Sequence, residues 1–135
     1  MGANSISEQL RASGNNRIMR VQFIVSPTAI ALVAGIVTKK SRVKASRCCY
    51  GVASTGTIDV RVSRDGTAPA SGVGDRIVSD VFDTATAAGT VIESEPPATA
   101  AGQILDAGNV IFVLPSTTLT NLSGCAVEIE IEPLE

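Results

Sequence analysis

The last residues of the chain alternate between apolar and polar side chains with a period of two. In the segment CAVEIEIE, residues 125–132, Cys, Val and Ile occupy every second position, and the positions between them hold Ala and then three Glu. Because successive side chains of a β-strand point to opposite faces, this pattern predicts a strand with one buried face and one acidic face. The acidic face, made of Glu128, Glu130 and Glu132, needs compensating charges or solvent beside its row of like charges.

Alternation of this kind recurs along the chain and predicts about eight strands. Some segments alternate apolar and polar residues, as half-buried strands do, and others are continuous apolar runs, as fully buried strands are. The run AIALVAGIVT follows Ser26 and Pro27, a pair that can also begin a helix, but Gly35 and the shortage of polar positions favour a strand. The expected strands are residues 18–25, 29–38, 41–49, 56–66, 76–83, 88–95, 110–115 and 125–132.

Short strands at close intervals, separated by Gly, Pro, Ser and Thr, are typical of an antiparallel β-sandwich, and eight is the strand number of a jelly roll. At 135 residues the chain has the length of one domain that can bury a core without metal or disulfide links. The predicted fold is all-β: an antiparallel, jelly-roll-like sandwich over residues 18–135 with an extended N-terminal arm, residues 1–17. Ser5 and Glu8 have capping-box spacing, so the arm can form a short helix over residues 6–12 or order against a neighbouring molecule.

The three cysteines lie on two of the predicted strands. Neighbours on a strand point to opposite faces, so Cys48 and Cys49 place one thiol toward the core and one away from it. The simplest interpretation is reduced thiols that behave as small apolar groups; the alternative is a covalent link, within the chain or to another subunit. A bridge from Cys125 to either of the other two requires adjacent strands. Unbroken alternation over residues 41–49 puts Arg42, Lys44, Ser46 and Cys48 on one face and Val43, Ala45, Arg47 and Cys49 on the other.

The composition argues against several kinds of catalytic site. The chain has no His, which removes the usual general base, the His of a catalytic triad and the commonest zinc ligand. Asp80 and Asp83, and likewise Glu93 and Glu95, lie two or three residues apart in strand-like sequence. Solvated outward positions explain these acids better than paired catalytic carboxylates do. We therefore expect no enzymatic activity, no cofactor and no metal.

Charge is divided unevenly between the two halves of the chain. Residues 1–64 carry ten Lys and Arg and two acids, whereas residues 65–135 carry one Arg and eleven acids. Two interpretations stay open. The halves can interleave so that the charges neutralise each other locally, or they can form a basic face and an acidic face that favour association with other molecules.

Neither nucleic acid nor a membrane is an expected partner. The stretch KKSRVKASR, residues 39–47, is basic, but aromatic residues make up 3% of the chain and the pI is about 5.1, which favours a protein-docking surface over nucleic-acid binding. The most apolar run, residues 29–37, is far shorter than the roughly 20 residues that a membrane-spanning helix needs.

Three segments, GTIDVRVSRDGTAPASG, AGQILDAGNVIFVLP and GCAVEIEIEP, resemble small β-sandwich proteins from the structural gene clusters of tailed phages, the head decoration or capsid cement proteins. The shared pattern is an alternating Val/Ile strand, a DGT-type turn, a middle rich in Thr, Ala and Gly, and an Ala-Gly motif before a buried strand. Here the turn is residues 65–67 and the motif is AGNVI at residues 107–111, with Asn109 in place of the commoner Asp. The resemblance spans residues 18–133.

The resemblance implies a protein on the outer capsid surface of the virion, made in the host cytoplasm, that joins neighbouring major capsid subunits and assembles as a homotrimer. The alternative is a tail- or fibre-associated sandwich that binds a receptor or glycan, for which stacking aromatics are few. We expect residues 1–17 to order only on the shell, and Arg42, Lys44 and Arg47 to contact acidic capsid surfaces or neighbouring subunits. The candidate interface residues are Arg11, Arg17, Arg20, Lys39, Lys40, Arg42, Lys44, Arg47, Glu128, Glu130 and Glu132, and the candidate disulfide or free-thiol residues are Cys48, Cys49 and Cys125.

Overall fold

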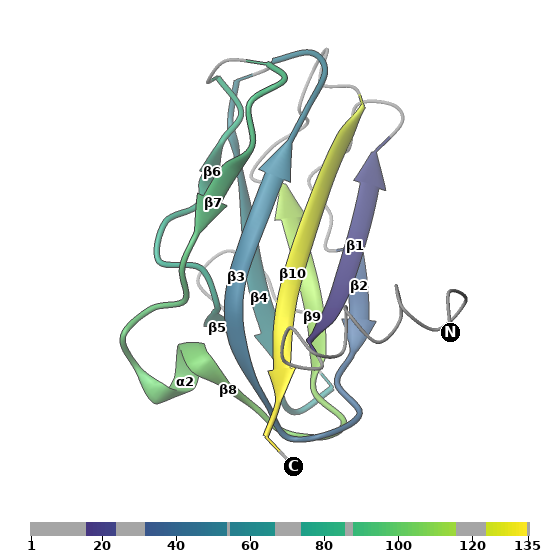
Figure 1. Ribbon diagram of the computed structural model, residues 1–135, viewed down its shortest axis with the longest axis vertical. Helices are drawn as coiled ribbons and strands as arrows, with labels where there is room; N and C mark the ends of the chain where they lie inside the picture. Colours follow the sequence, from purple (N-terminus) through teal and green to yellow (C-terminus); the bar gives the residue numbers. More distant parts are fainter. Residues whose placement is uncertain are drawn as a thin grey trace, which may run out of the picture.

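Two antiparallel β-sheets packed face to face form the body of the protein (Figure 1). The structure is a computed structural model that describes residues 16–23, 32–53, 55–66, 74–85, 88–115 and 124–134. Within these ranges one short helix, α2 (Ala100–Gln103), accompanies the strands. The strands are β1 (Arg17–Phe23), β2 (Leu32–Ile36), β3 (Ser41–Cys49), β4 (Thr57–Ser63), β5 (Asp75–Arg76), β6 (Phe82–Asp83), β7 (Ile92–Ser94), β8 (Ile104–Leu105), β9 (Val110–Pro115) and β10 (Cys125–Pro133).

The strand order is that of a jelly roll. Sheet A has the order β1-β10-β3-β7, with β8 also paired to β3, and sheet B has the order β2-β9-β4-β5, with β6 also paired to β4. The short strands β5 and β6 share one position beside β4, and β7 and β8 share one position beside β3, so the strands fill eight positions. The predicted all-β, jelly-roll-like sandwich is therefore confirmed.

The core between the sheets is mainly aliphatic. Inward side chains of β3, β4, β9 and β10 pack together, and burying each large apolar side chain contributes roughly 1.5–3 kcal/mol. Two aromatic side chains, Tyr50 and Phe82, are also fully buried. The inward residues of the last strand follow the predicted alternation, because Cys125, Val127, Ile129 and Ile131 are all buried.

Most predicted strands are present with shifted ends. The described part of the run at residues 29–38 forms β2, a strand rather than a helix. Residues 76–83 contain the end of β5 and the whole of β6, separated by bends, instead of one continuous strand. Residues 96–109, a low-complexity connection by composition, contain α2 and β8. The helix begins after Thr99, whose side chain accepts a hydrogen bond from the Gly102 amide.

Unbroken alternation along β3 is wrong, because a β-bulge interrupts the strand. Glu130 of β10 pairs with Ala45, and the next residue of β10, Ile131, pairs with Val43, so Lys44 is an extra residue in β3. Ala45 is buried like Val43, and the burial pattern changes phase from Ser46 onward. Ser46 and Cys48 are consequently buried, whereas Arg47 and Cys49 lie on the outer side. The prediction was the reverse: it grouped Ser46 and Cys48 with the exposed Arg42, and Arg47 and Cys49 with the buried Val43.

Two predictions concern residues outside the described ranges. Of the predicted arm, residues 1–17, the structure describes Asn16 and Arg17, and Arg17 already belongs to β1. The predicted helix over residues 6–12 and the candidate Arg11 lie outside. No helix in the described part of the chain has the length and apolar character needed to cross a membrane.

Candidate interaction surfaces

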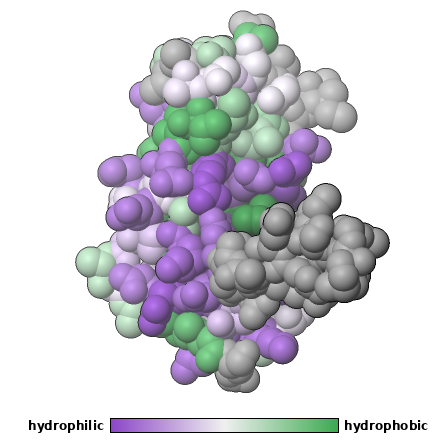
Figure 2. All heavy atoms as spheres, viewed as in Figure 1, coloured by the Kyte–Doolittle hydropathy of each residue, from purple (hydrophilic) through white to green (hydrophobic). Residues whose placement is uncertain are grey.

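The outer face of sheet A carries a row of alternating charges across four strands. Arg20 of β1 lies opposite Glu128 of β10, with Arg20 Nη2 2.5 Å from Glu128 Oε2. Arg47 of β3 lies on the other side of Glu128 and also opposite Glu93 of β7, with Arg47 Nε 2.8 Å from Glu93 Oε2. Figure 2 shows this face of the molecule as largely hydrophilic.

Glu130, in the neighbouring row, is held by two donors. Arg47 Nη2 donates to Glu130 Oε1 at 2.8 Å, and Asn16 Nδ2 donates to Glu130 Oε2. The hydrogen bonds from Arg47 and Asn16 lower the pKa of the Glu130 carboxyl, while the Glu130 and Glu93 carboxylates raise the pKa of Arg47. The Arg47 and Glu130 side chains are 30% and 20% exposed, so solvent screens their attraction less than that of a fully exposed pair.

These contacts decide between the two interpretations of the charge distribution on this face. Arg20 and Arg47 come from the basic half of the chain, and they bind Glu128 and Glu130 of the acidic half. On the outer face of sheet A the two halves therefore interleave, and their charges neutralise each other locally. Arg17, another predicted interface residue, donates from Nη1 to Thr38 Oγ1 at 2.9 Å.

Four exposed cations remain beside this neutralised face, and we call them the basic cluster. They lie in the β2–β3 turn and on the first half of β3, and none makes a salt bridge with a described residue. Glu132 pairs with one of them in strand register without a salt bridge between the two side chains. The basic cluster comprises Lys39, Lys40, Arg42 and Lys44.

Arg64, which the sequence analysis did not single out, organises one end of the molecule. Its Nε lies 2.9 Å from Asp75 Oδ2, and its Nη1 donates to Asn109 Oδ1 at 3.0 Å. Its Nη2 donates to the carbonyls of Ala101 and Ile104 at 2.6 and 3.0 Å. Asn109 is buried, and its Oδ1 also accepts from the Asp106 amide at 2.8 Å. The side-chain Oδ1 of Asn109, an atom that an Asp at this position would also have, thus joins the turn before β9 to Arg64.

The outer face of sheet B differs from that of sheet A because much of it is apolar. Val33 of β2 lies opposite Phe112 of β9, and Ile36 lies opposite Val110. Val33 and Ile36 are 59% and 57% exposed. The β9 side chains that face outward alternate with the buried ones and are half-buried. We call this surface the apolar face; its residues are Val33, Ile36, Val110, Phe112 and Leu114.

A further ion-pair group adjoins the apolar face on β4 and β5. Arg61 Nε lies 2.8 Å from Asp59 Oδ2, and Arg76 Nε lies 3.0 Å from Asp59 Oδ1. Asp59 and Arg61 were not candidates from sequence, because their strand looks like an ordinary half-buried one. Only the pairing of β4 with β5 brings Arg76 to the same carboxylate.

The three thiols are free, and two of them face each other. Cys48 and Cys125 are buried with their Sγ atoms 3.8 Å apart on the adjacent strands β3 and β10, whereas Cys49 is half-buried. The expected split of Cys48 and Cys49 between the two faces is confirmed. The hydrogen bond with Cys125 and burial raise the pKa of the Cys48 thiol, which keeps it in the unreactive protonated form.

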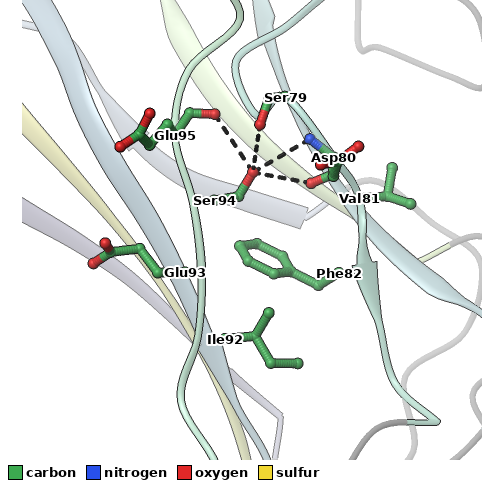
Figure 3. A pocket seen from close by; sticks show the side chains of 8 residues that line it. All are labelled: Ser79, Asp80, Val81, Phe82, Ile92, Glu93, Ser94 and Glu95. Carbon is green, nitrogen blue, oxygen red and sulfur yellow. Dashed lines mark hydrogen bonds between the residues drawn. The ribbon is translucent and has the colours of Figure 1, made fainter.

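A pocket of 460 Å³ opens between β6 and β7 (Figure 3). Ser94 Oγ is the hub of the hydrogen bonds in its lining, accepting from the Asp80 amide at 3.3 Å and lying 3.1 Å from the Asp80 carbonyl oxygen. Phe82 and Ile92 supply apolar walls, whereas the carboxylates of Glu93 and Glu95 point away from Phe82, and Glu93 binds Arg47. The Ser94 contacts hold the two segments together.

Metal-ligating groups and accessible aromatic rings are the two features that bear on ligand binding in the described residues. No group of three or more His, Cys, Asp or Glu is arranged to hold a metal ion among the described residues. Tyr50 and Phe82 are each 1% exposed, so their rings are not accessible for stacking on a sugar, whereas Phe112 is half-buried on the outward side of β9.

Comparisons with known proteins find a distant likeness among solved structures. No protein-family model matches the chain, and no curated protein matches it in sequence. Among solved structures, the chain is similar to a chain of the Cyanophage Pam1 capsid asymmetric unit, with 15% sequence identity and a TM-score of 0.48, covering 87% of this chain and 83% of that chain. A likeness of this strength assigns neither a function nor a partner.

Proposed function

We propose that this protein is a structural component of a tailed-phage virion, a cement or decoration protein that binds the outside of the capsid and stabilises contacts between major capsid subunits. The sequence resemblance over residues 18–133 supports this role. The structural observation that carries it is the basic cluster, which is exposed and unpaired among the described residues on an otherwise neutralised face. An acidic surface of a shell subunit complements such a cluster.

The proposed mechanism is a clamp across the shell. A protein that binds the assembled lattice, and not the free subunits, stabilises that lattice by mass action. Assembly as a homotrimer links three such contacts, so that each raises the effective concentration of the others. The jelly-roll body suits this task because its charged side chains are held on paired strands before binding.

Within this proposal the predicted interface residues have different tasks. Lys39, Lys40, Arg42 and Lys44 contact the acidic partner, since they are exposed. Arg47 supports that surface from within sheet A, because its guanidinium already binds Glu93 and Glu130.

Receptor or glycan binding by a tail or fibre protein is less well supported. Such sites depend on accessible aromatic rings, and among the described aromatic side chains Tyr50 and Phe82 are buried and Phe112 is half-buried. The β6–β7 pocket has Ser94 in its lining, but this hydroxyl is already engaged with the Asp80 backbone, and the Glu93 carboxylate binds Arg47.

Co-sedimentation with shells tests the proposal. Purified protein is mixed with shells assembled from the major capsid subunit of the same phage, and bound copies per shell subunit are counted at increasing salt. We expect a fixed stoichiometry, binding that weakens with salt, and roughly tenfold weaker binding for the Lys39→Gln/Lys40→Gln variant.

The matched control is Thr90→Glu/Ala98→Glu. It lowers the net charge by the same amount at exposed positions outside the basic cluster. It should bind within about twofold of the wild type, because the basic cluster is intact. Wild-type protein that stays in the supernatant at low salt would reject the proposed function. Binding that ignores both salt and Lys39→Gln/Lys40→Gln would reject the role of the basic cluster.

A further inference from the structure

The apolar face of sheet B has no covering in the described part of the chain. Its two most exposed side chains, Val33 and Ile36, lie on the edge strand β2, and each is directly opposite an outward apolar residue of β9. Contiguous exposed apolar surface of this kind marks an interaction site more often than isolated apolar residues do. On the outer face of sheet A, by contrast, the exposed Ile18 lies opposite Glu130, beside a paired carboxylate.

Charges in register with the apolar face limit what can cover it. A single cross-strand row runs from Val33 through Phe112 of β9 to Arg61 of β4 and Arg76 of β5. Asp59 is the one carboxylate that both of these arginines bind. Two guanidinium groups therefore border the apolar face on its β4 side.

The end of the apolar face at Ile36 is also positive. The β2–β3 turn begins directly after Ile36, at the end of β2, and it carries Lys39 and Lys40. Two copies that met through their apolar faces would bring these positive borders together, and like charges across an interface cost affinity. A partner with an apolar centre and carboxylates around it fits both features.

We propose that the apolar face is the surface that docks on the shell subunit, and that the shell presents there an apolar patch bordered by Asp or Glu. This inference rests on the proposed function and deepens it. It places the main contact on sheet B, with Lys39 and Lys40 orienting the protein at the border, and it leaves Arg42 and Lys44 of sheet A to contact neighbouring subunits. Buried apolar area then supplies affinity, and the borders supply specificity.

The experiment compares two pairs of exposed apolar residues in shell co-sedimentation. The test variant is Val33→Thr/Ile36→Thr. The matched control is Ile18→Thr/Val91→Thr, which changes side chains 51% and 61% exposed outside the apolar face. Thr keeps the β-branched shape that strands favour, and circular dichroism confirms folding of each variant. We expect roughly tenfold weaker shell binding for the test variant and less than about twofold for the control.

Each outcome has a defined meaning. If wild-type protein binds shells and the test variant binds equally well, or if the control loses as much, the apolar face is not the docking surface while the proposed function stands. If wild-type protein does not bind shells, both the proposed function and the shell as occupant are rejected. Sedimentation velocity of the protein alone covers the remaining possibility: self-association lost only in Val33→Thr/Ile36→Thr would identify a second copy as the occupant and overturn the inference.

Discussion

Arg47 Nη2 donates to Glu130 Oε1 across 2.8 Å, and this contact joins the basic half of the chain to the acidic strand at its end. The same guanidinium reaches Glu93 of β7, so one side chain ties three strands of sheet A together. A sequence with strongly separated charges thus folds into a face whose charges are largely matched. Excess positive charge is left at the β2–β3 turn and the start of β3.

The Glu130 ion pair predicts a pH-dependent loss of stability. Its pKa is lowered in the folded state, so its contribution is fully present above the unfolded value of about 4.3 and is lost as pH falls through the folded value. We expect Glu130→Gln to lower the free energy of unfolding by about 1 kcal/mol at pH 7. The difference from wild type should shrink toward pH 3. Urea unfolding at the two pH values measures it.

Glu132→Gln is the matched control for that experiment, because Glu132 makes no salt bridge with a described residue. It should change the free energy of unfolding by less than about 0.5 kcal/mol. A Glu130→Gln variant as stable as wild type at pH 7 would show that the Arg47–Glu130 pair adds nothing measurable.

Periodicity was sufficient to predict the fold class, because every long strand carries an alternating or continuous apolar pattern. It could not predict the bulge in β3. In the segment from Ser41 to Cys49, the sequence does not decide which alternate side chains face the core. That is set by the pairing of Glu130 with Ala45 and of Ile131 with Val43, across strands far apart in the chain. Register of this kind is a long-range property, so a local pattern does not contain it.

The interaction surfaces were only partly visible in the sequence for the same reason. The basic stretch at residues 39–47 was identified by composition. Which of its cations form ion pairs, as Arg47 does, and which stay exposed, as Lys39 does, depends on the residues of the neighbouring strands. The apolar face was missed because continuous apolar runs predict strands buried on both sides. Placing β2 at a sheet edge leaves its outward residues exposed instead.

The close approach of β1 to β2 gives a packing prediction. A Cβ added at Gly35 would lie 2.6 Å from Met19 Sδ and 3.1 Å from its Cγ. We expect Gly35→Ala to lower the free energy of unfolding by about 1–3 kcal/mol, because the buried Met19 side chain must move. Equilibrium unfolding in urea provides the measurement.

A double-mutant cycle with Met19→Ala separates this clash from other effects of the substitution. The cost of Gly35→Ala should be smaller by about 1 kcal/mol or more when Met19 is already truncated. Strictly additive costs would contradict a direct contact between the two positions.

The contacts of Arg64 predict that Lys cannot replace it. Its guanidinium reaches Asp75, Asn109 and two backbone carbonyls at once, and an ammonium group cannot match this planar arrangement of donors. We expect Arg64→Lys to destabilise the protein by about 1–3 kcal/mol. Arg42→Lys, on the exposed basic cluster, should change stability by less than about 0.5 kcal/mol. Equal effects in urea unfolding of the two variants would argue against an organising role for Arg64.

The placement of the thiols predicts a clear order of reactivity. Cys49 is half-buried, whereas Cys48 and Cys125 face each other in the core, and the pKa of Cys48 is raised by its hydrogen bond with Cys125 and by burial. Reaction of the folded, reduced protein with an aromatic disulfide reagent should therefore modify Cys49 first, and denaturant should release the other two thiols. Cys49→Ser should abolish the fast phase and leave the slow phase unchanged. A fast phase that survives in Cys49→Ser would mean that the Cys48–Cys125 pair opens to solvent readily, and the tight packing of β3 against β10 at this end would be wrong.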